Sequence, residues 1–342
     1  ANSNSITTTV NPMPNTLLFS NDPDNKICLG DNITFTALNS TQYEFFVNGV
    51  SQGAASATNT LSTTLLPAGN TEVTVRGTFG GCTAFSPDTI ITNVLALPPV
   101  TLISSDADNI ICAGESVTFT ASGASQYRFF VNNVAQGQFS ANNIFISSTI
   151  QNNQTIKVAG SDLGCTADGV PTITMAVKPN PATSLVSSDI DRIICLGDTV
   201  TFTASGAAQY EFFIDGVSLG TPSAVNTFTT AALVDSNRVQ VVGTSNGCSV
   251  ASGSLLFRVN PAPAVTLTSS DTDNTICTAD NITFSASGAN LYQFFINGTP
   301  ISNPSATAVR NISTLTNGQT VSLLGINQFG CSANAPQTFT II

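Results

Sequence analysis

A fifteen-residue motif occurs four times along this chain of 342 residues, at nearly constant spacing. The second copy, DADNIICAGESVTFT, runs from Asp106 to Thr120, and it consists of a short acidic loop, a cysteine, a turn and an alternating stretch. The other copies begin at Asp22, Asp189 and Asp271. Repetition at a fixed period indicates that each copy belongs to one structural unit, so we expect four similar units in series.

The eight cysteines follow the same period in two series. The first series is Cys28, Cys112, Cys195 and Cys277, and the second is Cys82, Cys165, Cys248 and Cys331. The nearly even step within the first series gives units near the small end of domain size. An even number of cysteines with no histidine indicates disulfides in an oxidising compartment, and predicts an extracellular or cell-surface protein.

Proline-rich segments separate the units, at 98–99, 179–181 and 261–263. Because proline donates no ladder hydrogen bond and stiffens short spacers, we place the domain boundaries there. The predicted domains are 12–97, 98–179, 180–261 and 262–342. Val10 precedes Cys28 by the same distance as Val177 precedes Cys195, so residues 1–11 are predicted to be the last strand of a truncated upstream repeat. The alternative is a strand that adds to a partner's sheet edge.

Within each unit the apolar residues alternate with a period of two. In the second unit Val117, Phe119 and Ala121 fall on one face of a predicted strand, and Tyr127, Phe129 and Val131 on one face of the next. Asn-Gly or Asp-Gly pairs at 48–49, 215–216 and 297–298 predict tight hairpins. Seven short strands per unit predict an all-β fold of four tandem immunoglobulin-like β-sandwich domains forming an extended rod, with almost no helix.

Charge and composition exclude several function classes. Charged residues make up 8% of the chain, and only nine are lysine or arginine, so we expect no nucleic-acid partner. No apolar run reaches the roughly 18 residues that span a bilayer, so we expect no membrane insertion. Without histidine there is no histidine-based acid–base pair or triad, and we predict that the chain is not an enzyme.

The sequence leaves two disulfide patterns open. Bonds within repeats would join Cys28 to Cys82, Cys112 to Cys165, Cys195 to Cys248 and Cys277 to Cys331. However, the first cysteine precedes the second strand and the other follows the sixth, and these strands run in the same direction. A strand of seven residues spans roughly 23 Å, whereas bridged Cα atoms lie about 4.4–6.8 Å apart.

We therefore favour bonds between repeats. These would join Cys28 to Cys165, Cys112 to Cys248 and Cys195 to Cys331, with Cys82 and Cys277 pairing outside the chain. Bonds within repeats remain an alternative if the first cysteine lies on a displaced strand beside the last one, or if the strand order differs. Bonds across the junctions would stiffen the joints between repeats.

Acidic residues cluster around each first-series cysteine. Aspartates lie six and four residues before it, and an acidic residue lies three after it; these last are Asp31, Glu115, Asp198 and Asp280. One interpretation is hydrogen bonding of the carboxylates to nearby backbone amides. The other is a Ca²⁺ site at each junction, with ligands from Asp22, Asp24, Asp106, Asp108, Asp189, Asp191, Asp271 and Asp273. Arg192 replaces an asparagine in the third loop and weakens that site.

Each unit also carries two adjacent phenylalanines, of which a strand directs one outward. The outward residues are predicted to be Phe46, Phe130, Phe213 and Phe295. They are either covered by the neighbouring hairpin or loop, or available for lateral contacts between chains. The tyrosines Tyr43, Tyr127, Tyr210 and Tyr292 are expected to complete the cores.

The recurring pattern IC-x-G-(D/E)-x-(V/I)-T-F-T-A, then Y-x-FF-(V/I)-(N/D)-(G/N) and V-x-G near Gly-Cys, resembles the tandem Ig-like repeats of large Bacteroidota surface proteins, of the gliding-motility adhesin type. Repeat four departs from it with Thr278-Ala279, which puts that turn in doubt. The resemblance implies export by the type IX system, attachment to the cell surface and a stalk or adhesive role in surface adhesion or gliding motility.

Two classes of function, and a third possibility, follow from these patterns. The first is a structural spacer in a secreted adhesin or extracellular filament, whose partners are neighbouring repeats of the same chain or like subunits. The second is a module that binds a glycan or a protein, and the third is the stalk of a secreted enzyme. Four near-identical units favour the spacer, because binding specificity usually lies in one divergent domain.

Overall fold

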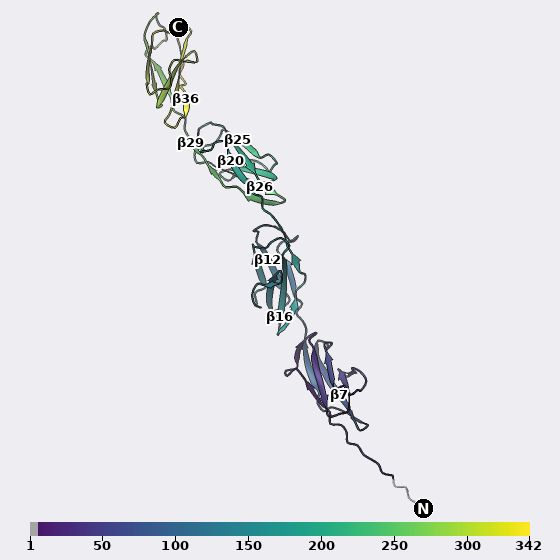
Figure 1. Cartoon of the computed structure of the whole chain (residues 1–342). Coiled ribbons are helices and arrows are strands. Elements are labelled where there is room, and N and C mark those ends of the chain that lie inside the picture. The colour runs from purple at the N-terminus through teal and green to yellow at the C-terminus, as the bar shows by residue number, and fades with distance from the viewer. Residues whose placement is uncertain (1–5) are drawn as a thin grey trace, which may run out of the picture. The chain divides into compact units, whose positions relative to one another are not determined.

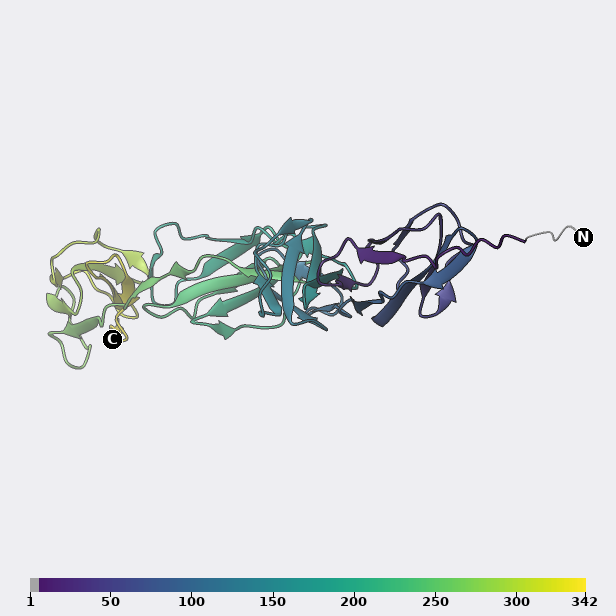
Figure 2. The same cartoon turned by 90° about the horizontal axis from the view of Figure 1, so that it is seen from below.

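The computed structural model describes residues 6–342, and every helix or strand assigned in that part of the chain is a β-strand (Figures 1 and 2). No described segment forms a helix that could cross a membrane. Residues 6–16 form no strand, and Ile6 and Val10 are exposed. The strand predicted over 1–11 lies partly outside the described residues, and its pairing with an upstream repeat stays a prediction.

The second repeat shows the arrangement most completely. Its strands are β10 (Thr101–Ser104), β11 (Ile110–Cys112), β12 (Val117–Ser122), β13 (Gln126–Val131), β14 (Val134–Ala135), β15 (Ile144–Ser147), β16 (Thr155–Asp162), β17 (Cys165–Asp168), β18 (Ile173–Thr174) and β19 (Ala176–Lys178). One sheet has the order β10-β12-β15, and the other has β14-β13-β16-β17 with β18 also on β16. A short parallel pair, β11-β19, completes the repeat. In Figure 1, β12 and β16 mark the two sheets.

The other repeats reuse the two-sheet plan, but in repeat one β9 (Ile90–Leu95) joins the parallel pair to the larger sheet, and in repeat four no parallel pair is assigned. Repeat one contains β1 (Leu17–Ser20), β2 (Lys26–Cys28), β3 (Ile33–Leu38), β4 (Gln42–Val47), β5 (Val50–Ser51), β6 (Thr60–Thr63), β7 (Gly69–Phe79), β8 (Cys82–Phe85) and β9 (Ile90–Leu95). Repeat three contains β20 (Ser184–Ser187), β21 (Ile193–Cys195), β22 (Val200–Ser205), β23 (Gln209–Ile214), β24 (Val217–Ser218), β25 (Thr227–Thr230), β26 (Arg238–Ser245), β27 (Cys248–Ala251), β28 (Leu255–Leu256) and β29 (Arg258–Asn260). Repeat four contains β30 (Thr266–Ser269), β31 (Ile282–Ser287), β32 (Leu291–Ile296), β33 (Thr299–Pro300), β34 (Val309–Ile312), β35 (Thr320–Ile326), β36 (Ser332–Asn334) and β37 (Phe339–Thr340). The chain divides into two compact units, 1–178 and 179–342.

Each repeat has its own hydrophobic core, built from the inward faces of its two sheets. A fully buried phenylalanine stands at the centre of each; the four are Phe35, Phe119, Phe202 and Phe284. The predicted inward faces are confirmed in repeat two, since Val117, Phe119 and Ala121 are at most 1% exposed. Burying a phenylalanine side chain contributes about 1.5–3 kcal/mol, so these positions dominate each core.

A tyrosine and a glycine face each other across the second sheet of every repeat. In repeat two, Tyr127 lies opposite Gly160, and the tyrosine is buried, as predicted for the four tyrosines. Its hydroxyl donates a hydrogen bond to the Ala124 carbonyl and accepts one from the Ala124 amide. A Cβ atom on Gly160 would overlap the side chains of Val100 and Ala124. The glycine therefore leaves room for the first strand, and the tyrosine covers it.

The last strand of each repeat is divided into separate pieces. In repeat two it is divided into β17, β18 and β19, with Gly169, Val170 and Pro171 between the first two pieces. Proline cannot donate to a ladder, which explains the interruption. Val170 instead exchanges backbone hydrogen bonds with the first strand, by donating to Val100 and accepting from Leu102. The later piece, β19, is thereby free to pair with β11.

The fourth repeat keeps the turn that its sequence put in doubt. The glycines that follow the first-series cysteines by two residues, Gly30, Gly114 and Gly197, have φ angles of 93°, 83° and 93°. Ala279 occupies the same place with a φ of 73°. An L-residue in this left-handed region is strained, whereas glycine is not. The strand that precedes the cysteine in the other repeats is not assigned in repeat four.

Replacing Ala279 by glycine is expected to stabilise repeat four by about 1 kcal/mol, because it removes the left-handed strain. Hydrogen exchange of repeat-four peptides would measure the change, since it reports each repeat separately. Gly114→Ala is the reverse substitution and serves as the control. It should destabilise repeat two by a similar amount, because no atom lies within 4 Å of the added Cβ and only the left-handed strain remains. A destabilised Ala279→Gly variant would contradict the argument.

Candidate functional site at the disulfide junctions

The second-series cysteines lie at hairpin tips. In repeat two, Leu163 and Gly164 form a two-residue turn between β16 and β17, with φ angles of 50° and 93°. Cys165 opens β17 directly opposite Asp162. Two consecutive left-handed residues are the hallmark of the tight turn that matches the twist of paired strands. The turn therefore fixes Cys165 at one extreme end of its repeat.

The first-series cysteines lie at the other end. Cys112 ends β11, which runs parallel to β19, and it pairs in register with Lys178. Cys28 pairs likewise with Leu95, and Cys195 with Asn260. Cys165 begins the divided last strand of repeat two and Lys178 ends it. At about 3.3 Å per residue, the length of that strand greatly exceeds the roughly 4.4–6.8 Å of a bridge. The displaced strand on which bonding within repeats depended is present as β11, beside the last strand. It places Cys112 at the end of the repeat opposite to Cys165, so the two cannot be bonded.

The bonds present join neighbouring repeats. Cys28 is bonded to Cys165 and Cys195 to Cys331, each with a Cα–Cα distance of 5.5 Å. Each bond lies within a single compact unit, Cys28–Cys165 in 1–178 and Cys195–Cys331 in 179–342. Cys112 and Cys248 are also disulfide-bonded, and their mutual pairing stays a prediction. Among the described residues the free cysteines are Cys82 and Cys277.

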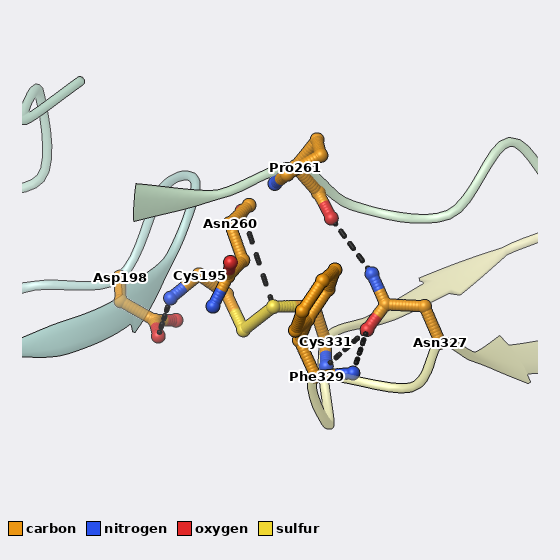
Figure 3. The surroundings of a disulfide bond; sticks show 7 residues. All are labelled: Cys195, Asp198, Asn260, Pro261, Asn327, Phe329 and Cys331. Atoms are coloured by element: carbon orange, nitrogen blue, oxygen red, sulfur yellow. Dashed lines mark hydrogen bonds between the residues drawn. A yellow bond between two sulfur atoms is a disulfide. The ribbon is translucent and has the colours of Figure 1, made fainter. Parts of the chain in front are cut away.

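Figure 3 shows the side chains that surround the bond between repeats three and four. The backbone amide of Cys195 donates to Asp198 Oδ2 at 2.9 Å. The Cys331 sulfur lies 3.9 Å from the carbonyl oxygen of Asn260. The disulfide that connects the two repeats thus lies in contact with the backbone of the linker between them.

Asn327 makes a second connection at this junction. Its Nδ2 donates to the Pro261 carbonyl at 2.8 Å, while its Oδ1 accepts from the amides of Phe329 and Cys331. One side chain therefore ties the hairpin tip to the linker. Neither Asn260 nor Asn327 was identified from the sequence. The recurrence of Val-Asn-Pro at 10–12 and 259–261 is the signal that marks Asn260.

The acidic residues cap backbone amides in their loops. In repeat two the amide of Ile110 donates to both Asp106 and Asp108 at 3.0 Å, and that of Cys112 donates to Glu115 at 3.0 Å. Repeat one makes the same contacts, whereas in repeats three and four the first aspartate accepts from the amide one residue earlier, that of Arg192 or Asn274. The acceptors in these loops are Asp22, Asp24, Asp31, Asp189, Asp191, Asp198, Asp271, Asp273 and Asp280. Within residues 6–342 no group of three or more acidic, cysteine or histidine side chains is arranged to hold a metal.

Adding a calcium chelator is expected to leave the melting temperature unchanged within about 1 °C, because the loop carboxylates already have backbone donors. Calorimetry with and without EDTA, followed by Ca²⁺ in excess, would measure this. A melting temperature that falls with EDTA and recovers with Ca²⁺ would support the calcium hypothesis instead, since a ligand bound to the folded state stabilises it.

The outward phenylalanines are half-buried. Phe46 packs against Phe85, with ring centroids 5.2 Å apart, and Arg76 lies over its ring at 5.7 Å. Arg128 covers Phe130 in the same way at 5.4 Å. Cationic side chains over aromatic faces shield them from water. Use of Phe46, Phe130, Phe213 and Phe295 in lateral contacts stays a prediction.

An ion pair flanks one of these aromatic clusters. Arg76 is paired with Glu44, which also accepts a hydrogen bond from the Ser51 hydroxyl at 2.8 Å. The Ser51 hydrogen bond, together with Arg76, holds the pKa of Glu44 below its ordinary value. Because the Arg76 side chain is 43% exposed, solvent screens this pair, which orders the outer face without contributing much stability.

A shallow hollow recurs at one place in the first three repeats; in repeat two it lies between β13 and the loop that follows β14. In repeat two, Tyr127, Phe129 and Phe145 line it together with polar residues of the loop. Its counterparts in repeats three and one involve Phe212 and Phe45. The recurrence makes this hollow a feature of the repeat fold.

The topology defines the class of protein. Paired sheets around four separate cores make this an all-β chain of tandem Ig-like sandwiches. Six disulfide-bonded cysteines point to an extracellular or secreted protein.

Comparisons with known proteins give only distant matches. No family model and no curated protein matches the chain. The four-domain ectodomain fragment of ICAM-5 aligns with a TM-score of 0.40 and 12% identity, over 96% of this chain and 100% of that one. The eight N-terminal Ig domains of Down syndrome cell adhesion molecule give 0.31 and 13%, over 96% and 55%. Fibronectin(III)-like modules of Clostridium thermocellum CbhA give 0.30 and 16%, over 48% and 95%.

Proposed function

We propose that this chain is a non-enzymatic structural segment, a stalk or spacer, of a large secreted cell-surface adhesin or extracellular filament. The observation that carries the proposal is the disulfide that joins adjacent repeats, as in Cys28–Cys165 and Cys195–Cys331. In line with the resemblance of its repeats, we assign it to the adhesins of Bacteroidota that are exported by the type IX system for surface adhesion or gliding.

The mechanical consequence follows from the number of covalent connections. Neighbouring repeats joined only by a linker can swivel about it, as is usual between domains with small interfaces. At the junction of repeats three and four, the chain passes through Asn260 and the disulfide joins Cys195 to Cys331 beside it. Two connections at one junction restrict the swivel and resist pulling. A repeated, stiffened joint is what a spacer requires and what a catalyst or a single binding site does not.

The same logic covers the remaining cysteines. A bond between Cys112 and Cys248 would extend the pattern to the central junction. Cys82 and Cys277 would then serve neighbouring repeats of the same long chain or like subunits. In this proposal the repeats form a stiffened, extended array.

Two measurements test the proposal. Peptide mapping under non-reducing conditions should recover Cys28–Cys165, Cys112–Cys248 and Cys195–Cys331. Small-angle scattering should show that reduction broadens the distribution of interdomain distances while each repeat stays folded by circular dichroism. Recovery of a Cys112–Cys165 peptide, or a distance distribution that reduction leaves unchanged, would overturn it.

A further inference from the structure

The bond between Cys195 and Cys331 forms the junction of repeats three and four. Cys82 occupies the place of Cys331 in repeat one, and Cys277 occupies the place of Cys195 in repeat four. Cys82 is the second-series cysteine of repeat one, and Cys277 is the first-series cysteine of repeat four. Both are free, whereas their counterparts Cys331 and Cys195 are bonded to each other. The bonded junction therefore provides an internal standard for the two unbonded halves.

The Cys82 half has the geometry of a formed junction. Its sulfur lies 3.7 Å from the carbonyl oxygen of Asn11, as the Cys331 sulfur lies 3.9 Å from that of Asn260, and each pair is 71 residues apart. Asn11 also donates a hydrogen bond from Nδ2 to the Gly80 carbonyl at the hairpin tip. In the formed junction, Asn260 is the residue that pairs in register with Cys195. Cys82 is thus held beside the position where a first-series cysteine lies.

The Cys277 half matches the other side. Its amide donates to Asp280 Oδ2 at 2.7 Å, as that of Cys195 donates to Asp198 at 2.9 Å. Cys277 is exposed, while Cys195 is half-buried in its bond. Similarly, Cys82 is half-buried, whereas Cys331 is 1% exposed. Cys82 thus shares its sulfur–carbonyl contact with Cys331, and Cys277 shares its amide–carboxylate hydrogen bond with Cys195. Both lack the cover that a partner repeat gives, and the short strand that holds Cys195 is not assigned at Cys277.

We propose that a second copy of this chain supplies the missing half, so that Cys277 of one copy bonds to Cys82 of the next and the copies join head to tail. A disulfide compound such as oxidised glutathione is the oxidant. The Cys277 thiolate attacks it, forms a mixed disulfide and releases one glutathione thiolate. The Cys82 thiolate then attacks the Cys277 sulfur, forms the protein disulfide and releases the second glutathione. Two protein thiols are oxidised and one glutathione disulfide is reduced to two thiols.

The proposal rests on the inter-repeat bonding of the proposed function, and two single variants of the full chain test it. Cys82→Ser keeps only the Cys277 thiol, and Cys277→Ser keeps only the Cys82 thiol. Each variant, and their equimolar mixture, is incubated with oxidised glutathione and followed by non-reducing electrophoresis. The mixture should form a covalent dimer at least tenfold faster than either variant alone. Its linking peptide should be Cys82–Cys277, and the unmodified chain should form a ladder of multimers.

The outcomes separate this inference from the function on which it rests. Dimers of a single variant that form as fast as the mixed dimer would overturn the inference, because they show indiscriminate thiol oxidation. An unmodified chain that stays monomeric, or closes a bond within one molecule, would overturn it too. If the same digests contain Cys28–Cys165 and Cys195–Cys331, such a failure leaves the proposed function standing. If those peptides are missing, both fail.

Discussion

Replacing Cys195 and Cys331 together by serine is expected to lower the free energy of unfolding of repeat four by about 4 kcal/mol. The size follows from the loop that the bond closes when that repeat unfolds. The linker is held beside Cys195 through its register with Asn260, so the unfolded chain is tied between Asn260 and Cys331. These two residues lie 71 residues apart in the sequence. Closing a loop of this length removes about 4 kcal/mol of entropy from the unfolded state.

Hydrogen exchange measured by mass spectrometry gives the free energy for each repeat in the intact chain. Peptides from β32 and β35 should lose protection, while those from β4 and β7 in repeat one should not change. The matched control is Cys82→Ser with Cys277→Ser, which removes two cysteines and no bond within the chain. A double variant at Cys195 and Cys331 that exchanges like this control would show that the bond does not stabilise the folded repeat.

Much of each repeat could be predicted from its own sequence, because the period of two and the turn residues act locally. Phe119 is fully buried as the alternation requires, and the hairpin expected at 297–298 joins β32 to β33. The interruption of the last strand at Pro171 could not be predicted locally, because a proline interrupts a ladder only where its missing donor faces a partner strand, and that partner is distant in sequence. The pairing of Cys112 with Lys178 is a contact distant in sequence that composition does not encode.

The junction between repeats could be predicted only in part, because its contacts also join residues that are distant in the sequence. The cysteine spacing and strand directions argued against bonds within repeats, but they carried no information on what surrounds the sulfur atoms. Asn327 lies in a turn of repeat four and bonds to Pro261, 66 residues away, so no local pattern could reveal it. The acidic loops show the converse case, since carboxylates near a turn fit both backbone capping and a cation, and only coordinates give each carboxylate its donor.

Gly123→Ala is expected to destabilise repeat two by about 3 kcal/mol, and its reason lies in the linker. Gly123 follows β12 with a φ of 91°, so alanine there costs about 1 kcal/mol of left-handed strain. In addition, its Cβ would overlap the carbonyl group of Pro99, which is backbone and cannot rotate away. Overpacking of this kind costs roughly 1–3 kcal/mol. Gly206 and Gly288 face the carbonyls of Ala182 and Ala264 in the same way. In each of repeats two to four, the linker that precedes the repeat therefore packs against the glycine of this turn.

The matched control is Gly114→Ala in the same repeat, where φ is 83° and nothing lies within 4 Å of the added Cβ. That variant carries the strain without the overlap, so it should cost only about 1 kcal/mol. Hydrogen exchange of β12 and β13 peptides would measure both variants. The difference of about 2 kcal/mol isolates the contact between linker and repeat. Equal losses at the two positions would mean that Pro99 moves aside at no cost, and that the linker is not held by the turn on which a stiff junction depends.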